Sequence, residues 1–207
     1  MIVQDCLHDL SHRDQLGALL TKWGMCSSMV EVGTFKGDYA RVLLNTFPGR
    51  LYCIDPWVNQ PREDYFDGAN LYPMDEVFRE AQVKLNDPRC TLIRAKGSEA
   101  VGGFGPESQD AVYLDGNHRL EIVRAELQAW WPRVKIGGIL CGHDYNVRYD
   151  KDTDSDALTA VAEFAEFLGV RVHVTWCTSW YIVKTKELDQ QFRAGIKLDI
   201  PLKETRQ

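Results

Sequence analysis

Short runs of apolar residues alternate along this chain with longer segments in which apolar side chains recur every three or four positions. The runs predict buried β-strands, and the longer segments predict amphipathic helices. Core strands are expected at 27–32, 51–55, 91–95, 110–115 and 136–141, and helices at 11–24, 39–44, 74–85, 119–131 and 157–168. A closing pair of strands is expected at 170–175 and 180–184, followed by a polar tail after Glu187.

The order of these elements predicts the fold class. Strands that alternate with helices need right-handed crossover connections, which make the strands parallel in one sheet. We therefore predict an α/β protein with a Rossmann-like doubly wound sheet. The sheet should be mostly parallel, with an antiparallel closing strand and helices on both faces. Residues 1–207 should form a single domain, in which the helix at 11–24 and the irregular loop at 56–73 serve as lid or substrate elements.

Composition and charge narrow the classes of function. The 207 residues are 44% hydrophobic and 26% charged, which is ordinary for a soluble globular domain. The net charge of −6, without a lysine or arginine cluster, argues against nucleic acid as a partner. The sequence has no apolar run of membrane-spanning length and no signal-peptide pattern, so a cytoplasmic protein without a membrane partner is expected. Six scattered cysteines fit a reducing compartment better than a disulfide framework.

The first core strand passes into its helix through the turn Glu31-x-Gly33-Thr34-Phe35-x-Gly37. The two glycines let the backbone turn sharply and approach a ligand closely, and the first N–H groups of the helix face the turn. An acid at the strand end would repel a phosphate and suits a ligand that carries an ammonium group. The dinucleotide pattern G-x-G-x-x-G is absent. These five residues are candidates for binding a nucleoside-type cofactor, although an ordinary strand-to-helix turn could carry the same pattern.

Three residues after later strands could complete a nucleoside site. Asp55 ends the second strand, 22 positions after Gly33, where a carboxylate can bind the hydroxyls of a ribose. Trp57 could cover an adenine face, and Ser98 after the third strand could bond the adenine amine. The alternatives are that Asp55 caps a turn, that Trp57 packs on the surface and that Ser98 caps the helical turn near Glu99.

Acidic and imidazole side chains gather where the fourth and fifth strands end. Asp115 ends the fourth strand and His118 follows it, while His143 and Asp144 follow the fifth strand. In a doubly wound sheet the first, fourth and fifth strands are neighbours, so these side chains should share one crevice with the ligand near Gly33. This convergence is the most specific feature of the sequence.

The motifs around these residues resemble one family of enzymes. Segments 115–118 (DGNH), 130–138 (WWPRVKIGG) and 142–145 (GHDY), together with the glycine turn, resemble class I S-adenosylmethionine-dependent methyltransferases. The similarity is to the group of macrocin O-methyltransferase-like and cephalosporin-hydroxylase-like enzymes, and more distantly to catechol O-methyltransferase. Segments 160–164 and 179–181 resemble the closing part of that group, so the resemblance covers roughly residues 27–185.

The resemblance implies a chemistry for the residues at the strand ends. S-adenosylmethionine would be the cofactor, contacted by Asp115 among others, and Asp115, His143 and Asp144 would bind a divalent metal that holds the acceptor hydroxyl. His118 would be the base that removes the hydroxyl proton, a role that a neutral histidine suits near pH 7. Histidine at position 143 departs from the usual carboxylate and favours zinc, iron or manganese over magnesium. Without a metal, Asp144 would only orient the substrate.

These observations predict an S-adenosylmethionine-dependent methyltransferase that modifies a hydroxyl of a small molecule. The alternative is a non-catalytic protein of methyltransferase-like fold that binds a nucleoside or a protein partner. An NAD-dependent oxidoreductase is disfavoured by the missing glycine pattern, and a metal-assisted oxygenase because the same histidines and acids fit the methyltransferase layout. A homo-oligomer is compatible with the sequence.

Overall fold

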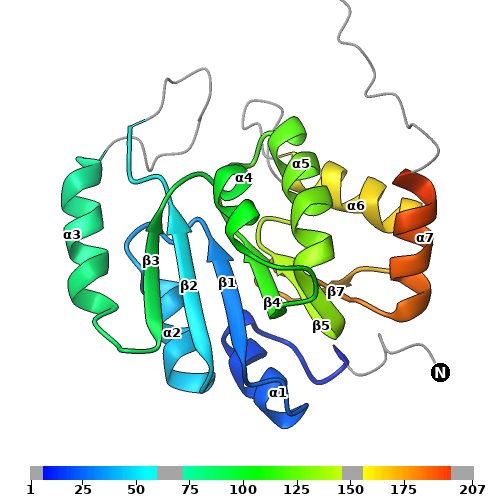
Figure 1. Cartoon of the computed structure of the whole chain (residues 1–207), viewed down its shortest axis with the longest axis horizontal. Coiled ribbons are helices and arrows are strands. Elements are labelled where there is room, and N and C mark those ends of the chain that lie inside the picture. Colours follow the sequence, from blue (N-terminus) through cyan, green and yellow to red (C-terminus); the bar gives the residue numbers. More distant parts are fainter. Residues whose placement is uncertain (1–6, 60–71, 146–155, 197–207) are drawn as a thin grey trace, which may run out of the picture.

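The computed structural model describes residues 7–59, 72–145 and 156–196, and these residues form a mixed sheet of seven strands (Figure 1). The strands are β1 (Ser28–Val32), β2 (Arg50–Asp55), β3 (Cys90–Arg94), β4 (Gln109–Leu114), β5 (Val134–Gly142), β6 (His173–Val174) and β7 (Trp180–Val183). Their order is β3-β2-β1-β4-β5-β7-β6. Strands β1 to β5 are parallel, and β7 runs antiparallel to both β5 and β6. The predicted fold class is confirmed, with a closing pair shorter than expected.

Helices lie on both faces of this sheet. They are α1 (Leu16–Lys22), α2 (Asp38–Thr46), α3 (Met74–Lys84), α4 (Gly97–Ala100), α5 (Leu120–Trp130), α6 (Ala157–Leu168) and α7 (Lys186–Ile196), with short 3-10 turns at Arg13–Gln15, Val101–Gly103 and Trp131–Arg133. Helices α1 and α2 share one apolar core with the sheet, and α5, α6 and α7 share another. Helix α3 stands at the β3 side of the molecule and α7 at the opposite side (Figure 1).

Alternation along the strands separates these two cores. In β1 the side chain of Met29 lies in the core under α1 and α2, while Val30 and Val32 lie in the core under α5. All six residues of β4 are buried because this central strand has a strand on each side and helices on both faces. This explains why the strands read as continuous apolar runs.

Strands β1, β2, β4 and β5 end at one level, which positions the site. Val32 pairs with Ile54 on one side and with Leu114 on the other, and Leu114 pairs with Gly142. The chain order reverses between β1 and β4, which is where a doubly wound sheet opens a crevice at the carboxyl ends of its strands. The loops that carry the candidate residues therefore meet at one edge.

The N-terminal helix differs in detail from its prediction. It begins as a 3-10 turn whose N-cap is His12 rather than Ser11, and Gln15 closes the cap from the third position. Leu16 and Leu20 of α1 are fully buried against α2. Helix α1 therefore packs on the core, and its role as a lid or substrate element stays a prediction. The other candidate lid, the loop at 56–73, lies outside the described residues from 60 to 71.

The polar tail expected after Glu187 was wrong, because the chain forms α7 there. Phe192 on this helix is 2% exposed and packs among the rings of the α6 core. Asp189 forms an ion pair with the fully buried Lys184 at 3.0 Å, and the Lys184 ammonium also donates to the carbonyls of Trp131 and Val134. Sparse apolar residues between charged ones concealed the helix in the sequence.

We expect Asp189→Asn to lower the free energy of unfolding by about 2 kcal/mol, because it leaves the buried Lys184 ammonium without its counter-charge. Urea unfolding followed by circular dichroism measures the change. Glu187→Gln on the same helix is the control, since this carboxylate is exposed. Equal midpoints for the two variants would show that Asp189 does not hold α7 in place.

None of the helices in the described part of the chain combines the length and the apolar character that crossing a membrane requires.

Candidate active site

A cavity of about 700 Å³ opens at the carboxyl ends of the parallel strands. It is lined by predicted residues from the loops after five different strands, among them Gly33, Asp55, Ser98, Asp115, His118 and Asp144. A volume of this size is typical of small-molecule sites. The predicted convergence of these strand ends on one crevice is confirmed by the geometry.

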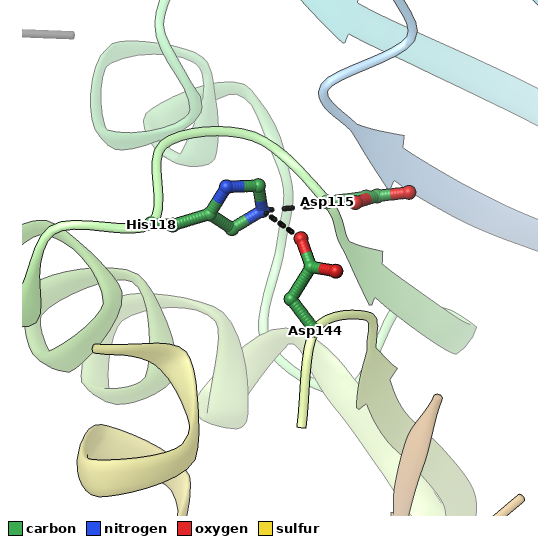
Figure 2. Close-up of side chains that lie close together, drawn as sticks. All are labelled: Asp115, His118 and Asp144. Carbon is green, nitrogen blue, oxygen red and sulfur yellow. Dashed lines mark ion pairs between the residues drawn. The ribbon is translucent and has the colours of Figure 1, made fainter. Parts of the chain in front are cut away.

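Asp115, His118 and Asp144 form the tightest group in this cavity, and we refer to them as the acid–imidazole cluster (Figure 2). The Nε2 atom of His118 lies 2.9 Å from Oδ2 of Asp144 and 3.8 Å from Oδ1 of Asp115. One potential ligand atom from each residue lies within 4.8 Å of the other two, which is close enough for a shared metal ion. Two carboxylates and one imidazole suit manganese, iron or zinc.

His143, which the sequence predicted as a metal ligand, lies beside this cluster and not in it. Its Nδ1 atom is 2.9 Å from Oδ1 of Asp144 and 3.9 Å from Oδ1 of Asp115. Asp144 thus receives one imidazole on each carboxylate oxygen. The two imidazoles thus lie at similar distances from the two carboxylates, but only His118 belongs to the group whose ligand atoms are all within 4.8 Å of one another. The metal role of His143 stays a prediction.

The carboxylates change the protonation of both imidazoles. Burial by itself lowers the pKa of His118, but the hydrogen bonds and charges of Asp115 and Asp144 outweigh burial and raise that pKa to about 10. Burial also lowers the pKa of His143, but the hydrogen bond and the charge of Asp144 outweigh burial and raise that pKa overall. The two imidazoles in turn hold the pKa of Asp144 well below its usual range, against the effect of burial. To act as a general base, His118 would have to give up the proton that these carboxylates stabilise, so its role as the base stays a prediction.

Asp144 has a left-handed backbone conformation shortly after the end of β5. The N–H of His143 still donates to the Leu114 carbonyl, so the β5 pairing continues to this point. Asp144 then takes a φ of 59°, a value uncommon for residues other than glycine. Phe35 and Trp57, after β1 and β2, also have positive φ values. Such conformations are often found at functional sites, where the surrounding structure holds them.

Arg13 is a residue near the site that the sequence analysis missed. Its guanidinium lies 3.5 Å from Oδ2 of Asp115 and 4.7 Å above the ring of Tyr39. The Tyr39 hydroxyl donates to the backbone carbonyl of Arg13 at 2.8 Å, which ties the N-terminal turn to α2. The sequence gives no signal for this contact, since Arg13 stands in an ordinary polar segment far from Asp115.

The two glycines of the β1 turn allow close contacts with neighbouring segments that a Cβ atom would block. Gly33 has a φ of 90°, and a Cβ there would overlap the carbonyl oxygen of Asp115 and lie 2.6 Å from the Cα of Gly116. Gly37, with a φ of 78°, is the N-cap of α2, and a Cβ would lie 2.8 Å from the side chain of Leu85. Gly33 lines the cavity as predicted, whereas the close neighbour of Gly37 is Leu85. The predicted close approach at Gly33 is thus made by the β4 loop.

Glu31 and Thr34 are buried beside this turn. Glu31 is 2% exposed and Thr34 is 4% exposed, and neither Oε2 of Glu31 nor Oγ1 of Thr34 has a hydrogen-bond partner among the described residues. Burial raises the pKa of Glu31 to about 8, an effect that the nearby Thr34 hydroxyl offsets only in part. Neither side chain lines the cavity, although the neighbouring residues Val32, Gly33 and Phe35 do.

The raised pKa of Glu31 predicts a pH-dependent stability. The folded state holds the Glu31 proton up to about pH 8, so it binds more protons than the unfolded chain above about pH 4.5. Stability should therefore fall as the pH rises through this window. Relative to Glu31→Gln, we expect the wild type to lose about 2 to 3 kcal/mol between roughly pH 5 and pH 7. Urea unfolding at the two pH values measures the loss, and parallel pH profiles for both proteins would contradict it.

Asp55 ends β2 as predicted and lines the cavity, while Trp57 does not face it. The Asp55 carboxylate accepts the backbone N–H of Phe35 at 2.9 Å and that of Trp57 at 2.7 Å. The Trp57 indole is fully buried, donates to the carbonyl of Phe35 and packs 4.7 Å from the ring of Phe78. This burial speaks against the predicted role of Trp57 as a cover for an adenine ring. Phe35 itself lines the cavity.

Ser98 lies in the first turn of α4 and lines the cavity, but Lys96 and not Ser98 is the N-cap of this helix. Glu126 of α5 lines the same part of the cavity and was missed by the sequence analysis. Its carboxyl contacts Gly97, and burial raises its pKa to about 7 against the effect of the His118 charge. A signal was present, because Glu126 occupies the apolar stripe between Val123 and Trp130.

A family model described as a methyltransferase domain matches residues 30–145, which is more than half of the chain. The chain belongs to this family. The matched region runs from β1 to the loop after β5, so it contains the glycine turn and the whole acid–imidazole cluster. The predicted resemblance to class I methyltransferases is confirmed at this level.

The chain is also similar to proteins with known sequences or structures. The uncharacterized protein y4gI of Sinorhizobium fredii is 23% identical over 125 residues, which cover 58% of this chain and only 13% of that protein. The O-methyltransferase NovP has 16% identity and a TM-score of 0.59 over 89% of this chain and 78% of its own. A protein of Corynebacterium glutamicum has 20% identity and a TM-score of 0.55 over 83% and 81%. MycE, a methyltransferase of mycinamycin biosynthesis solved with Mg and SAH, has 15% identity and a TM-score of 0.53 over 81% and 48%. At these identities the likeness shows a shared fold.

Proposed function

We propose that the protein is an S-adenosylmethionine-dependent methyltransferase that transfers a methyl group to a hydroxyl of a small molecule with the help of a divalent metal. The observation that carries this proposal is the shared cavity, in which the β1 turn and Asp55 adjoin the acid–imidazole cluster. A methyl donor and an oxygen nucleophile must meet at short range, and transfer depends mainly on their orientation. One cavity with two adjoining polar sites supplies that arrangement.

The residues of the cavity fit a cofactor with positive charge and a ribose. Asp55 and Asp115 are acids in the wall, and they favour a sulfonium or ammonium cation over a phosphate. Each Asp55 oxygen accepts one backbone N–H and keeps a free lone pair, so the carboxylate could still accept bonds from ribose hydroxyls. The unpartnered Thr34 hydroxyl and Glu31 carboxyl lie in the same turn as Gly33.

The acid–imidazole cluster fits a divalent metal. Asp115, His118 and Asp144 would hold it, with His143 and Arg13 orienting the two carboxylates from behind. A bound metal would act as a Lewis acid that lowers the pKa of the acceptor hydroxyl. In this role His118 is a ligand. Binding a metal through Nε2 and acting as a base both require that His118 first lose the proton that Asp115 and Asp144 stabilise.

The acceptor should be a small molecule with an apolar part. Phe35, Tyr72 and Met74 form an apolar wall of the cavity, and the rings of Phe35 and Tyr72 pack edge to face with centroids 5.7 Å apart. Aromatic and aliphatic walls with a few polar groups are typical of sites for small organic ligands.

The first experiment is a thermal-shift titration with S-adenosylmethionine, S-adenosylhomocysteine and NAD. We expect both S-adenosyl ligands to raise the melting temperature by about 5 °C or more at a hundredfold excess over Kd, because they bind only the folded state. NAD should give no shift. Stabilisation by NAD alone would overturn the assignment of the cofactor.

A non-catalytic protein that binds a nucleoside or a protein partner is the second candidate. The observation that favours it is the 2.9 Å contact between His118 Nε2 and Asp144, which raises the pKa of the imidazole and so opposes metal binding through this nitrogen. Transfer of a labelled methyl group from S-adenosylmethionine to any acceptor in a metabolite extract would exclude this candidate.

A further inference from the structure

Glu126 is a buried carboxyl at the cavity wall that the proposed methyl transfer does not use. The residue is 5% exposed and lines the cavity from α5. Within the described segments, no hydrogen bond or ion pair reaches its side chain. A carboxyl group held out of water without a partner costs stability. A ligand group that donates a hydrogen bond to Glu126 would offset this cost.

The position of Glu126 indicates which part of a nucleoside it would meet. Gly97 follows β3, and a Cβ added there would overlap the Oε1 atom of Glu126, so the carboxyl occupies the space beside this glycine. Asp55 ends the neighbouring strand β2, whereas the acid–imidazole cluster follows β4 and β5. If Asp55 binds the ribose, the base lies toward Gly97 and Glu126, and the methyl group lies toward the cluster. This step rests on the proposed cofactor.

We propose that Glu126 recognises the adenine ring of the cofactor by accepting a hydrogen bond from its exocyclic amine. A carboxyl oxygen is an acceptor in both protonation states, so the bond forms on either side of the raised pKa of this group. A purine with a keto oxygen in place of the amine would present an acceptor to the ionised Glu126 carboxylate, and both groups would be left unpaired. The protonated carboxyl could instead donate to the keto oxygen, so the two ligands are compared at roughly pH 8.5, where the ionised form prevails. Glu126 would therefore select adenine over 6-ketopurines, and Gly97 is needed to admit its carboxyl.

The test compares two ligands by isothermal titration calorimetry: S-adenosylhomocysteine and S-inosylhomocysteine, which carries oxygen in place of the amine. We expect the wild type to bind the adenine ligand about 10- to 100-fold more tightly, because a buried group is left unpaired in the other complex. In Glu126→Gln the amide can rotate and donate to the keto oxygen, so the preference should fall to roughly threefold or less. Glu126→Leu should lose the preference and also bind the adenine ligand more weakly. Glu166→Gln, which removes an exposed carboxylate on α6, is the matched control and should keep the wild-type preference.

The outcomes separate this inference from the function on which it rests. If the wild type binds neither ligand, the proposed cofactor is wrong. If the wild type binds S-adenosylhomocysteine but does not discriminate, or if Glu126→Gln and Glu126→Leu discriminate as the wild type does, the cofactor assignment stands and the role of Glu126 is wrong. Glu126→Gln preserves the size of the side chain, so it keeps the test valid even if the leucine variant fails to fold.

Discussion

Gly33→Ala is expected to lower the free energy of unfolding by about 4 kcal/mol or more. The residue has a φ of 90°, and an added Cβ would meet the backbone of Asp115 and Gly116. Neither atom belongs to a flexible side chain, so relief requires that the β1 turn and the β4 loop move apart. The backbone strain of a non-glycine residue in this region adds to the cost. The same movement would widen the cavity, so binding of S-adenosylhomocysteine should be lost with the stability.

Thermal and urea unfolding measure this effect. A loss of about 4 kcal/mol corresponds to a fall in melting temperature of roughly 8 °C or more for a chain of this size. Gly102→Ala is the matched control, because an added Cβ at Gly102 meets no atom within 4 Å and the residue has no positive φ. Its melting temperature should stay close to that of the wild type. Equal melting temperatures for the two variants would mean that the β1 turn does not approach the β4 loop as the structure shows.

Asp144→Asn is expected to weaken Mn²⁺ binding by about 100-fold or more, because it replaces a charged ligand by a neutral one. Mutation of residues that only orient a metal ligand already weakens metal binding by about 10- to 100-fold. Asparagine tolerates the left-handed backbone at this position and has the shape of aspartate, so the fold should be kept. Isothermal titration calorimetry with Mn²⁺ alone measures the effect without a known methyl acceptor. Asp75→Asn, an exposed aspartate on α3 that pairs with Arg94, is the control and should bind as the wild type does.

The two histidines near Asp144 allow a sharper form of the same experiment. We expect His118→Gln to weaken Mn²⁺ binding about 100-fold or more, because His118 supplies a ligand atom. His143→Gln should cost only about 10-fold, because His143 orients Asp144 from outside the cluster. The reverse order would restore His143 as the ligand that the sequence predicted. No binding of Mn²⁺ by the wild type would remove the metal from the proposed function.

Several side chains of the site were assigned to the wrong position or missed because their surroundings come from distant parts of the chain. Trp57 follows Asp55 in the sequence, which suggested a place above the ligand, but α3 supplies Phe78 and buries the indole. Arg13 reaches Asp115 from the N-terminal turn, and no local pattern marks such a contact. Glu126 did carry a signal, as a charged residue in an apolar helical stripe.

The sequence by itself determined the alternation of strands and helices, the parallel sheet and the strand ends at which polar residues gather. These features follow from local periodicity and from the handedness of the crossover connections, which need no knowledge of side-chain packing. Only the tertiary structure showed which imidazole shares a compact group with both carboxylates, because His118 and His143 both follow strand ends and the sequence does not show how far their rings lie from Asp115 and Asp144. It also decided that α7 docks on the sheet, since the ion pair of Asp189 with Lys184 forms only when the helix has folded back. Periodicity specifies which face of an element is buried, whereas the partner that each polar group meets depends on three-dimensional packing.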